Sequence, residues 1–183
     1  SSGNFNEAYH SFTKSQLNKK YEKCNKTEFQ NYVINYEKNL NNKNFYLKRD
    51  SFFIEKNKVC FLIGFPRSGT TLLDTVLRSH PYIDVIEEKP MLGVLEQSLN
   101  LVNDVSVIEN YNDDTAKSLR RKYFSEMRKY TETTEGLITI DRHPMNILKL
   151  PLINRVFPAA KFILVLRHPL DVILSCYIQN FNT

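Results

Sequence analysis

The 183-residue chain has only three cysteines and four histidines. Cys24, Cys60 and Cys176 lie far apart with no C-x-x-C pair, which argues against a disulfide framework and against a zinc site. The histidines also lack metal-ligand spacing, so no metal ion is expected. No apolar run approaches the roughly 20 residues that cross a bilayer, and no signal peptide is visible. We therefore expect a cytoplasmic protein without a transmembrane segment.

Acidic residues are fewer than basic ones, and the net charge is +5. This balance fits an anionic ligand, and it fits a lysine-rich composition without functional meaning equally well. The lysines are scattered rather than gathered into one stripe with interleaved aromatic residues, which disfavours nucleic acid as a partner. With 42% hydrophobic and 25% charged residues, the chain has the composition of a globular protein.

Residues 1–50 contain one glycine and no proline, and their apolar residues recur at helical spacing. We interpret them as a helical N-terminal segment, a hairpin of two helices packed on a neighbour, with Thr27 as the N-cap of the second helix. A second interpretation is the end of a tetratricopeptide-like array that recruits a protein partner. One pair of helices cannot by itself establish a repeat.

Residues 56–183 alternate between short apolar runs and amphipathic segments. Strands are expected over 59–64, 83–86, 137–140 and 161–166, and helices over 70–79, 90–101, 115–130, 144–156 and from Pro169 onward. This order predicts an α/β fold with a P-loop-type, mainly parallel sheet flanked by helices. Ligands of such sheets bind beyond the carboxyl ends of the strands. Because the chain stops directly after a helix, we interpret 56–183 as a domain that lacks its C-terminal part.

The first strand runs into a glycine-bounded loop that opens a helix, and a helix N-terminus with free backbone N–H groups binds anions. The spacing from Gly64 to Gly69 matches a phosphate-binding loop. However, Thr70 stands where a nucleoside triphosphatase has its lysine, and the positive charge is instead at Arg67 within the loop. The loop therefore predicts an anion site that differs from an ordinary nucleoside triphosphate site.

The last strand ends in a loop of similar construction. It carries Arg167, and Ser175 follows about two helical turns later. Since parallel strands end at one edge of the sheet, Arg67 and Arg167 should lie along one crevice. The planar fork of arginine suits bidentate binding of oxyanions. Two such loops predict a ligand with two separated anionic groups.

Together these motifs resemble those of sulfotransferases that use 3′-phosphoadenosine 5′-phosphosulfate (PAPS). Pro66-Arg-Ser-Gly-Thr-Thr71 is similar to their 5′-phosphosulfate loop, and Arg167-His-Pro-Leu-Asp-Val-Ile-Leu-Ser175 to their 3′-phosphate motif. The likeness runs from about residue 58 to the end and is strongest to bacterial sulfotransferases with tetratricopeptide helices and to tyrosylprotein sulfotransferases. It implies transfer of a sulfuryl group from PAPS to an acceptor hydroxyl. The implied 5′-phosphosulfate ligands are Arg67, Ser68, Gly69, Thr70 and Thr71, and the implied 3′-phosphate ligands are Arg167 and Ser175.

The same resemblance implies catalytic residues. Tyrosylprotein sulfotransferases have their general base at the spacing of Glu88 from the loop arginine, and a positioned base contributes roughly 10²–10⁴ in rate. His143 is an alternative base. Arg142 stands where related enzymes have a lysine that contacts the leaving oxygen of the donor, and it keeps the charge without the compact ammonium. Gln179 stands where tyrosylprotein enzymes have an arginine, and Glu87 fits a simpler role beside a helix N-terminus.

Two other functions fit parts of the sequence. In a P-loop kinase or NTPase, Thr71 would lie at Mg²⁺, and residues 137–141, which end in Asp141, would form a Walker B strand. The absent loop lysine and the second arginine motif argue against it. A catalytically weak, nucleotide-dependent interaction module is the other alternative. The acceptor stays open between peptide tyrosine, glycan, lipid and small-molecule hydroxyls, because loops such as 102–116 that build acceptor pockets carry no readable motif.

Overall fold

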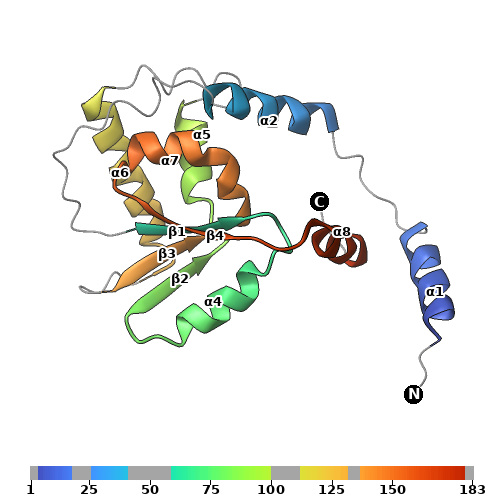
Figure 1. The fold of residues 1–183 in the computed structure, drawn as a ribbon. Helices are drawn as coiled ribbons and strands as arrows, with labels where there is room; N and C mark the ends of the chain where they lie inside the picture. Colours follow the sequence, from blue (N-terminus) through green and yellow to red (C-terminus); the bar gives the residue numbers. More distant parts are fainter. Residues whose placement is uncertain (1–3, 18–25, 41–58, 100–111, 132–136, 180–183) are drawn as a thin grey trace.

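A computed structural model describes residues 4–17, 26–40, 59–99, 112–131 and 137–179 (Figure 1). Its centre is a sheet of four strands in the order β2-β3-β1-β4. The strands are β1 (Val59–Gly64), β2 (Ile83–Glu87), β3 (Ile138–Arg142) and β4 (Lys161–Val165). All three strand pairs are parallel, which confirms the predicted α/β fold with a parallel sheet.

The carboxyl ends of the strands lie at one edge of this sheet. Gly64, at the end of β1, pairs with Val165 at the end of β4, while Glu87 of β2 pairs with Arg142 of β3. Because β1 lies between β3 and β4, the chain changes sides of β1 between those two strands. A parallel sheet binds its ligands at such a crossover point, beyond the carboxyl ends.

One face of the sheet is covered by α5 (Met91–Leu99), α6 (Asp113–Met127) and α7 (Leu150–Val156), with α2 (Lys26–Leu40) over α7 (Figure 1). Phe61 of β1, Tyr123 of α6 and Phe157 form a buried aromatic cluster between sheet and helices. The ring centroids of Tyr123 and Phe157 are 4.8 Å apart in an edge-to-face arrangement, a favourable geometry for two aromatic rings. This cluster anchors the larger of the two cores.

The opposite face is covered by α4 (Thr70–Arg78), which follows β1 directly. Leu62, Val85 and Ile140 form a second buried cluster on this side, and Leu73 and Leu77 of α4 pack against it. Successive residues of β1 thus face different cores, as the period of a strand requires. The result is three layers, with α4 on one side and α5, α6 and α7 on the other (Figure 1).

The predicted helix over 144–156 is wrong in one respect, because the segment is divided. A 3-10 helix (Pro144–Lys149) is followed by α7, which has Pro151 in its first turn. A proline lacks the N–H for the helical hydrogen bond and its ring clashes with the carbonyl four residues earlier, so a single α-helix cannot pass through Pro151. A smaller error concerns Thr27, which lies inside the first turn of α2 because that helix begins at Lys26.

The two N-terminal helices do not form the predicted hairpin. Whereas α2 lies over α7, α1 (Phe5–Leu17) lies beside α8 (Pro169–Ile178), and the rings of Phe12 and Tyr177 have centroids 5.9 Å apart (Figure 1). The interpretation as the end of a helical array stays a prediction. Across the described ranges, every helix is too short or too polar to cross a bilayer.

Asp141 of β3 is completely buried against the larger core. Tyr123 Oη donates to its Oδ2 at 2.7 Å, and Asn146 Nδ2 donates to its Oδ1 at 3.4 Å. Burial raises the pKa of Asp141 to about 7, although the hydrogen bond from Tyr123 and the charge of Lys149 act in the opposite direction. Desolvation therefore dominates over the two favourable contacts.

This carboxyl should make stability depend on pH. An unfolded aspartate titrates near 3.9, so between about pH 4 and about pH 7 the folded chain holds a proton that the unfolded chain has lost, and the free energy of unfolding falls as pH rises. In Asp141→Asn that dependence disappears, and the variant gains on the order of 1–4 kcal/mol relative to wild type across this window. Urea unfolding at several pH values measures the difference. The control is Asp113→Asn, which removes an exposed carboxylate on α6 and should leave the dependence of the unfolding free energy on pH unchanged. If the difference in unfolding free energy between Asp141→Asn and wild type were the same at every pH, the assignment would be contradicted.

Candidate active site

The loop after β1 has a strained backbone that shapes it for ligand binding. Arg67 and Gly69 both adopt the left-handed region, with φ of 68° and 106°. Ser68 closes the turn, because its N–H and its Oγ donate to the carbonyl oxygen of Phe65 at 3.1 and 2.6 Å. Gly69 is the N-cap of α4, and the first turn of that helix holds no acidic residue. Free N–H groups at the start of α4 therefore meet no competing carboxylate from that turn.

Gly64 allows β1 and β4 to meet closely where the two loops begin. A Cβ at this position would lie 2.8 Å from the carbonyl oxygen of Val165 and 2.9 Å from Ser68 Oγ. Both distances are shorter than real Cβ contacts, and the first involves the backbone. The glycine therefore lets the loop after β1 lie against the end of β4.

The two arginine loops contact each other. Arg167 Nη1 donates to the carbonyl oxygen of Arg67 at 3.1 Å, and Arg67 Nε donates to Ser175 Oγ at 3.1 Å. The structure therefore brings together the two motifs that the sequence separates by about a hundred residues. Both side chains are exposed and available to an anion.

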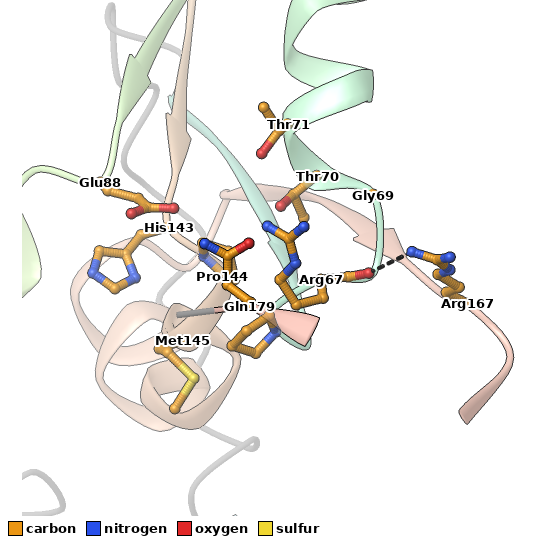
Figure 2. Close-up of a pocket in the computed structure, with 11 residues that line it drawn as sticks. Arg67, Gly69, Thr70, Thr71, Glu88, His143, Pro144, Met145, Arg167 and Gln179 are labelled. Atoms are coloured by element: carbon orange, nitrogen blue, oxygen red, sulfur yellow. Dashed lines mark hydrogen bonds between the residues drawn. The ribbon is translucent and has the colours of Figure 1, made fainter. Parts of the chain in front are cut away.

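A pocket of about 410 Å³ opens beside these loops (Figure 2). It is lined by Pro66, Arg67, Gly69, Thr70, Thr71, Glu88, His143, Pro144, Met145, Arg167 and Gln179. Its volume falls within the range of small-molecule sites. Figure 2 shows Glu88 and His143 on one side, Arg167 on the other and Arg67 between them. Most predicted site residues thus converge here from the ends of all four strands.

Three predicted site residues do not line the pocket. Ser68 is buried, and its hydroxyl is used within the loop. Ser175 lies beyond the pocket wall, bound to Arg67. Arg142 is the largest fully buried side chain of the described residues and lies beneath the pocket rather than in it.

Glu88 lies at the end of β2 and reaches the pocket with a half-exposed side chain. Its φ of 47° is in the left-handed region, which a non-glycine residue adopts only at a cost. Its N–H donates to the carbonyl oxygen of Arg142 at 2.8 Å. The neighbouring strand therefore holds this turn, and with it the position of the carboxylate.

Arg142 forms ion pairs with three carboxylates. Its Nε is 3.0 Å from Asp74 Oδ2 and its Nη1 is 3.1 Å from Glu88 Oε1, while its Nη2 contacts Glu87 Oε1. Burial lowers the pKa of Arg142, and the charge of nearby Arg78 acts in the same direction, whereas Asp74 raises it. Arginine nevertheless stays protonated at neutral pH. The guanidinium thus serves as a buried cation around which the acidic groups gather.

His143 follows Arg142 and lines the pocket beside Glu88 (Figure 2). Burial lowers its pKa, and the positive charges of Lys149 and Arg142 lower it further against the opposing effect of Glu96. Its buried Nδ1 has no hydrogen-bond partner among the described atoms. At neutral pH it is therefore an uncharged and comparatively weak base.

The position of Asp141 does not support a Mg²⁺-dependent reaction at this site. Asp141, the acid of the Walker-like strand, is buried against Tyr123 and does not line the pocket. Within the described ranges, no group of three or more His, Cys, Asp or Glu side chains is arranged to hold a metal ion. The burial of Asp141 away from the pocket does not favour the kinase or NTPase alternative, which needs this acid at the bound Mg²⁺.

Sequence reasoning missed two kinds of site residue. Pro144 and Met145 form an apolar part of the wall from the start of the 3-10 helix, and the available signal was their place just after the third predicted strand. Asp74 was missed because it sits in the apolar run of α4. An acid among Leu72, Leu73 and Val76 is the signal that was available.

The fold and the site define an α/β domain with exposed arginines on two adjoining loops and a half-exposed carboxylate beside them. The model of the sulfotransferase family matches residues 60–183, and the chain belongs to this family.

Two relatives have matching segments. An uncharacterized protein of Aquifex aeolicus (strain VF5) is 32% identical over 130 residues, which cover 66% of this chain and 17% of that protein. The nodulation protein NoeE of Sinorhizobium fredii (strain NBRC 101917 / NGR234) is 28% identical over 138 residues, 64% of this chain and 30% of that protein. The chain thus spans less than a third of the length of either relative.

The close approach at Gly64 yields a prediction on stability. The free energy of unfolding of Gly64→Ala should be roughly 1–3 kcal/mol lower than that of wild type, because the new Cβ pushes apart the ends of β1 and β4. Gly93→Ala is the matched control: in α5 the nearest atom to a new Cβ would be 3.9 Å away, and alanine is a better helix former. Thermal denaturation compares the two variants. Equal melting temperatures would contradict the role of Gly64.

Proposed function

We propose that this chain transfers a sulfuryl group from PAPS to an acceptor hydroxyl, with Glu88 as general base. The observation that carries the proposal is the convergence of the Arg67 loop, the Arg167 loop and Glu88 on one pocket. Two loops that bind oxyanions suit a donor with two separated anionic ends. Family membership supports sulfuryl transfer in general.

Different residues would bind the two anionic ends of this donor. The 5′-phosphosulfate would bind to Arg67 and to the N–H groups at the start of α4, with Thr70 and Thr71. The 3′-phosphate would bind to Arg167 and Ser175. In this arrangement Ser175 would exchange its hydrogen bond with Arg67 for one with the phosphate.

The reaction is an in-line displacement at sulfur. Glu88 takes the proton of the acceptor hydroxyl as its oxygen forms a bond to sulfur, while the bond between sulfur and the phosphate oxygen breaks. The electron pair of that bond stays on the phosphate. Arg67 and the loop N–H groups stabilise the negative charge that develops there, and donors already in position give the largest stabilisation.

The acceptor would bind on the side of the pocket opposite Arg167. Glu88, His143 and Met145 form the wall opposite Arg167, which fits a hydroxyl carried by a peptide tyrosine, a glycan or a small molecule. Residues 102–111 of the predicted acceptor loop lie outside the described residues. The cytoplasmic location and a protein partner for the N-terminal helices stay predictions from the sequence.

Donor binding tests the proposal directly. In the complete polypeptide that carries this sequence, calorimetric titration should detect 3′-phosphoadenosine 5′-phosphate and no comparable affinity for ATP with Mg²⁺. Arg167→Ala should weaken that binding about tenfold or more, since a charge-assisted hydrogen bond contributes about 1.5–3 kcal/mol. Arg121→Ala, an exposed arginine of α6, is the control. A preference for ATP would overturn the proposal.

Turnover tests the assignment of Glu88. Glu88→Gln keeps the shape of the side chain but cannot accept a proton, so kcat should fall at least about tenfold while the Kd of the donor changes less than about twofold. Glu87→Gln is the neighbouring comparison, with a smaller loss expected because Glu87 does not line the pocket. Wild-type turnover by Glu88→Gln would exclude it as the base. Donor binding without any transfer by the wild-type protein would favour the interaction module.

A further inference from the structure

Asp74 is a buried carboxylate beneath the active site. It lies on the second turn of α4, and its side chain is only 5% exposed. One oxygen is 3.0 Å from Arg142 Nε, and the other accepts from Arg78 Nε. An acid so far from solvent is costly unless it is paired, and Asp74 is paired on both sides.

Asp74 is the buried end of a chain of contacts that leads to the pocket. Arg142, 1% exposed, lies between Asp74 on one side and Glu87 and Glu88 on the other. The two glutamates are 54% and 56% exposed, so water screens their ion pairs more than it screens the pair of Asp74. Asp74 is therefore the partner that fixes the position of the guanidinium, and the guanidinium in turn holds the carboxylate of Glu88.

The backbone of Glu88 needs this support. Its left-handed conformation is costly for a non-glycine residue and persists only where neighbouring groups determine it. Arg142 contacts Glu88 twice, through its carbonyl oxygen at 2.8 Å and through Nη1 at 3.1 Å. A displaced guanidinium would release the second contact, and the backbone contact alone does not hold the carboxylate.

Asp74 also shares the charge of Arg142 with Glu88. The charged or titratable groups around this carboxylate are Asp74 and Arg78 from α4, Glu87 from β2, Arg142 from β3, and His143 and Arg67, which line the same pocket. With Asp74 in place, the positive charge of Arg142 is shared among three carboxylates. Without it, the guanidinium would be held only by the two half-exposed glutamates.

We propose that Asp74 is a positioning residue of the active site, which acts through Arg142 to hold the Glu88 carboxylate at the pocket. The inference rests on the proposed function, because it concerns the same base. It also gives Arg142 a role beneath the pocket instead of direct contact with the donor.

The test is Asp74→Asn in the complete polypeptide. We expect kcat to fall about tenfold with the KM values of donor and acceptor within about twofold, because the base is misplaced while the binding loops are intact. A purely structural Asp74 would instead lower the number of donor-binding sites in proportion to the rate, and calorimetric titration with 3′-phosphoadenosine 5′-phosphate separates the two roles.

Asp84→Asn is the matched control. It removes a carboxylate from the other end of β2, where Asp84 accepts from Thr131, and should keep the wild-type kcat. If Asp74→Asn keeps wild-type kcat while the wild-type protein transfers sulfuryl, this inference is overturned and the proposed function stands. No transfer by wild type would overturn both.

Arg142→Lys carries the test if Asp74→Asn does not fold. A lysine keeps the charge that Asp74 needs, but one ammonium cannot reach carboxylates on both sides as the guanidinium fork does. We expect kcat to fall with the Kd of the donor unchanged within about twofold. A rise in kcat would mean that the position works by direct contact with the donor, and would overturn the inference.

Discussion

The parallel pairing of β1 with β4 at Gly64 is the constraint on which the site depends. It brings the loops that follow two strands into direct contact, so that Arg167 binds the backbone of Arg67. A larger residue at Gly64 would meet the carbonyl of Val165. The site is thus a property of the sheet edge, where the ends of all four strands meet, and no single loop contains it.

A second constraint lies one layer deeper, where a buried cation gathers the acidic groups. Arg142 ends the strand beside β1 and carries ion pairs to Asp74, Glu87 and Glu88. Its guanidinium is inaccessible while two of its partners reach solvent. Such an arrangement transfers the rigidity of the core to a carboxylate at the surface, which is how a catalytic group keeps its geometry without being buried itself.

The sequence was sufficient for the features that depend on local order along the chain. Alternating strands and helices predicted the parallel sheet, and the glycine spacing around Arg67 predicted the tight turn between β1 and α4. It could not show that the guanidinium of Arg142 turns inward, because that depends on Asp74 in a helix nearly 70 residues away. The break before α7 was visible in principle, since Pro151 stands within the expected helix, but the separation of α1 from α2 depends on packing that periodicity does not encode.

Under the proposed function, the hydrogen bond between Arg67 and Ser175 would link the two anion sites thermodynamically. An anion that draws Ser175 toward one site would release a donor of Arg67 for the other, so occupation of either site would change the affinity of its counterpart by the same factor. A molecule that carries both anions on one frame would gain further, because its second contact would form at a high effective concentration. Separate anions would gain only the first of these effects, so such a site would discriminate by connectivity as well as by charge.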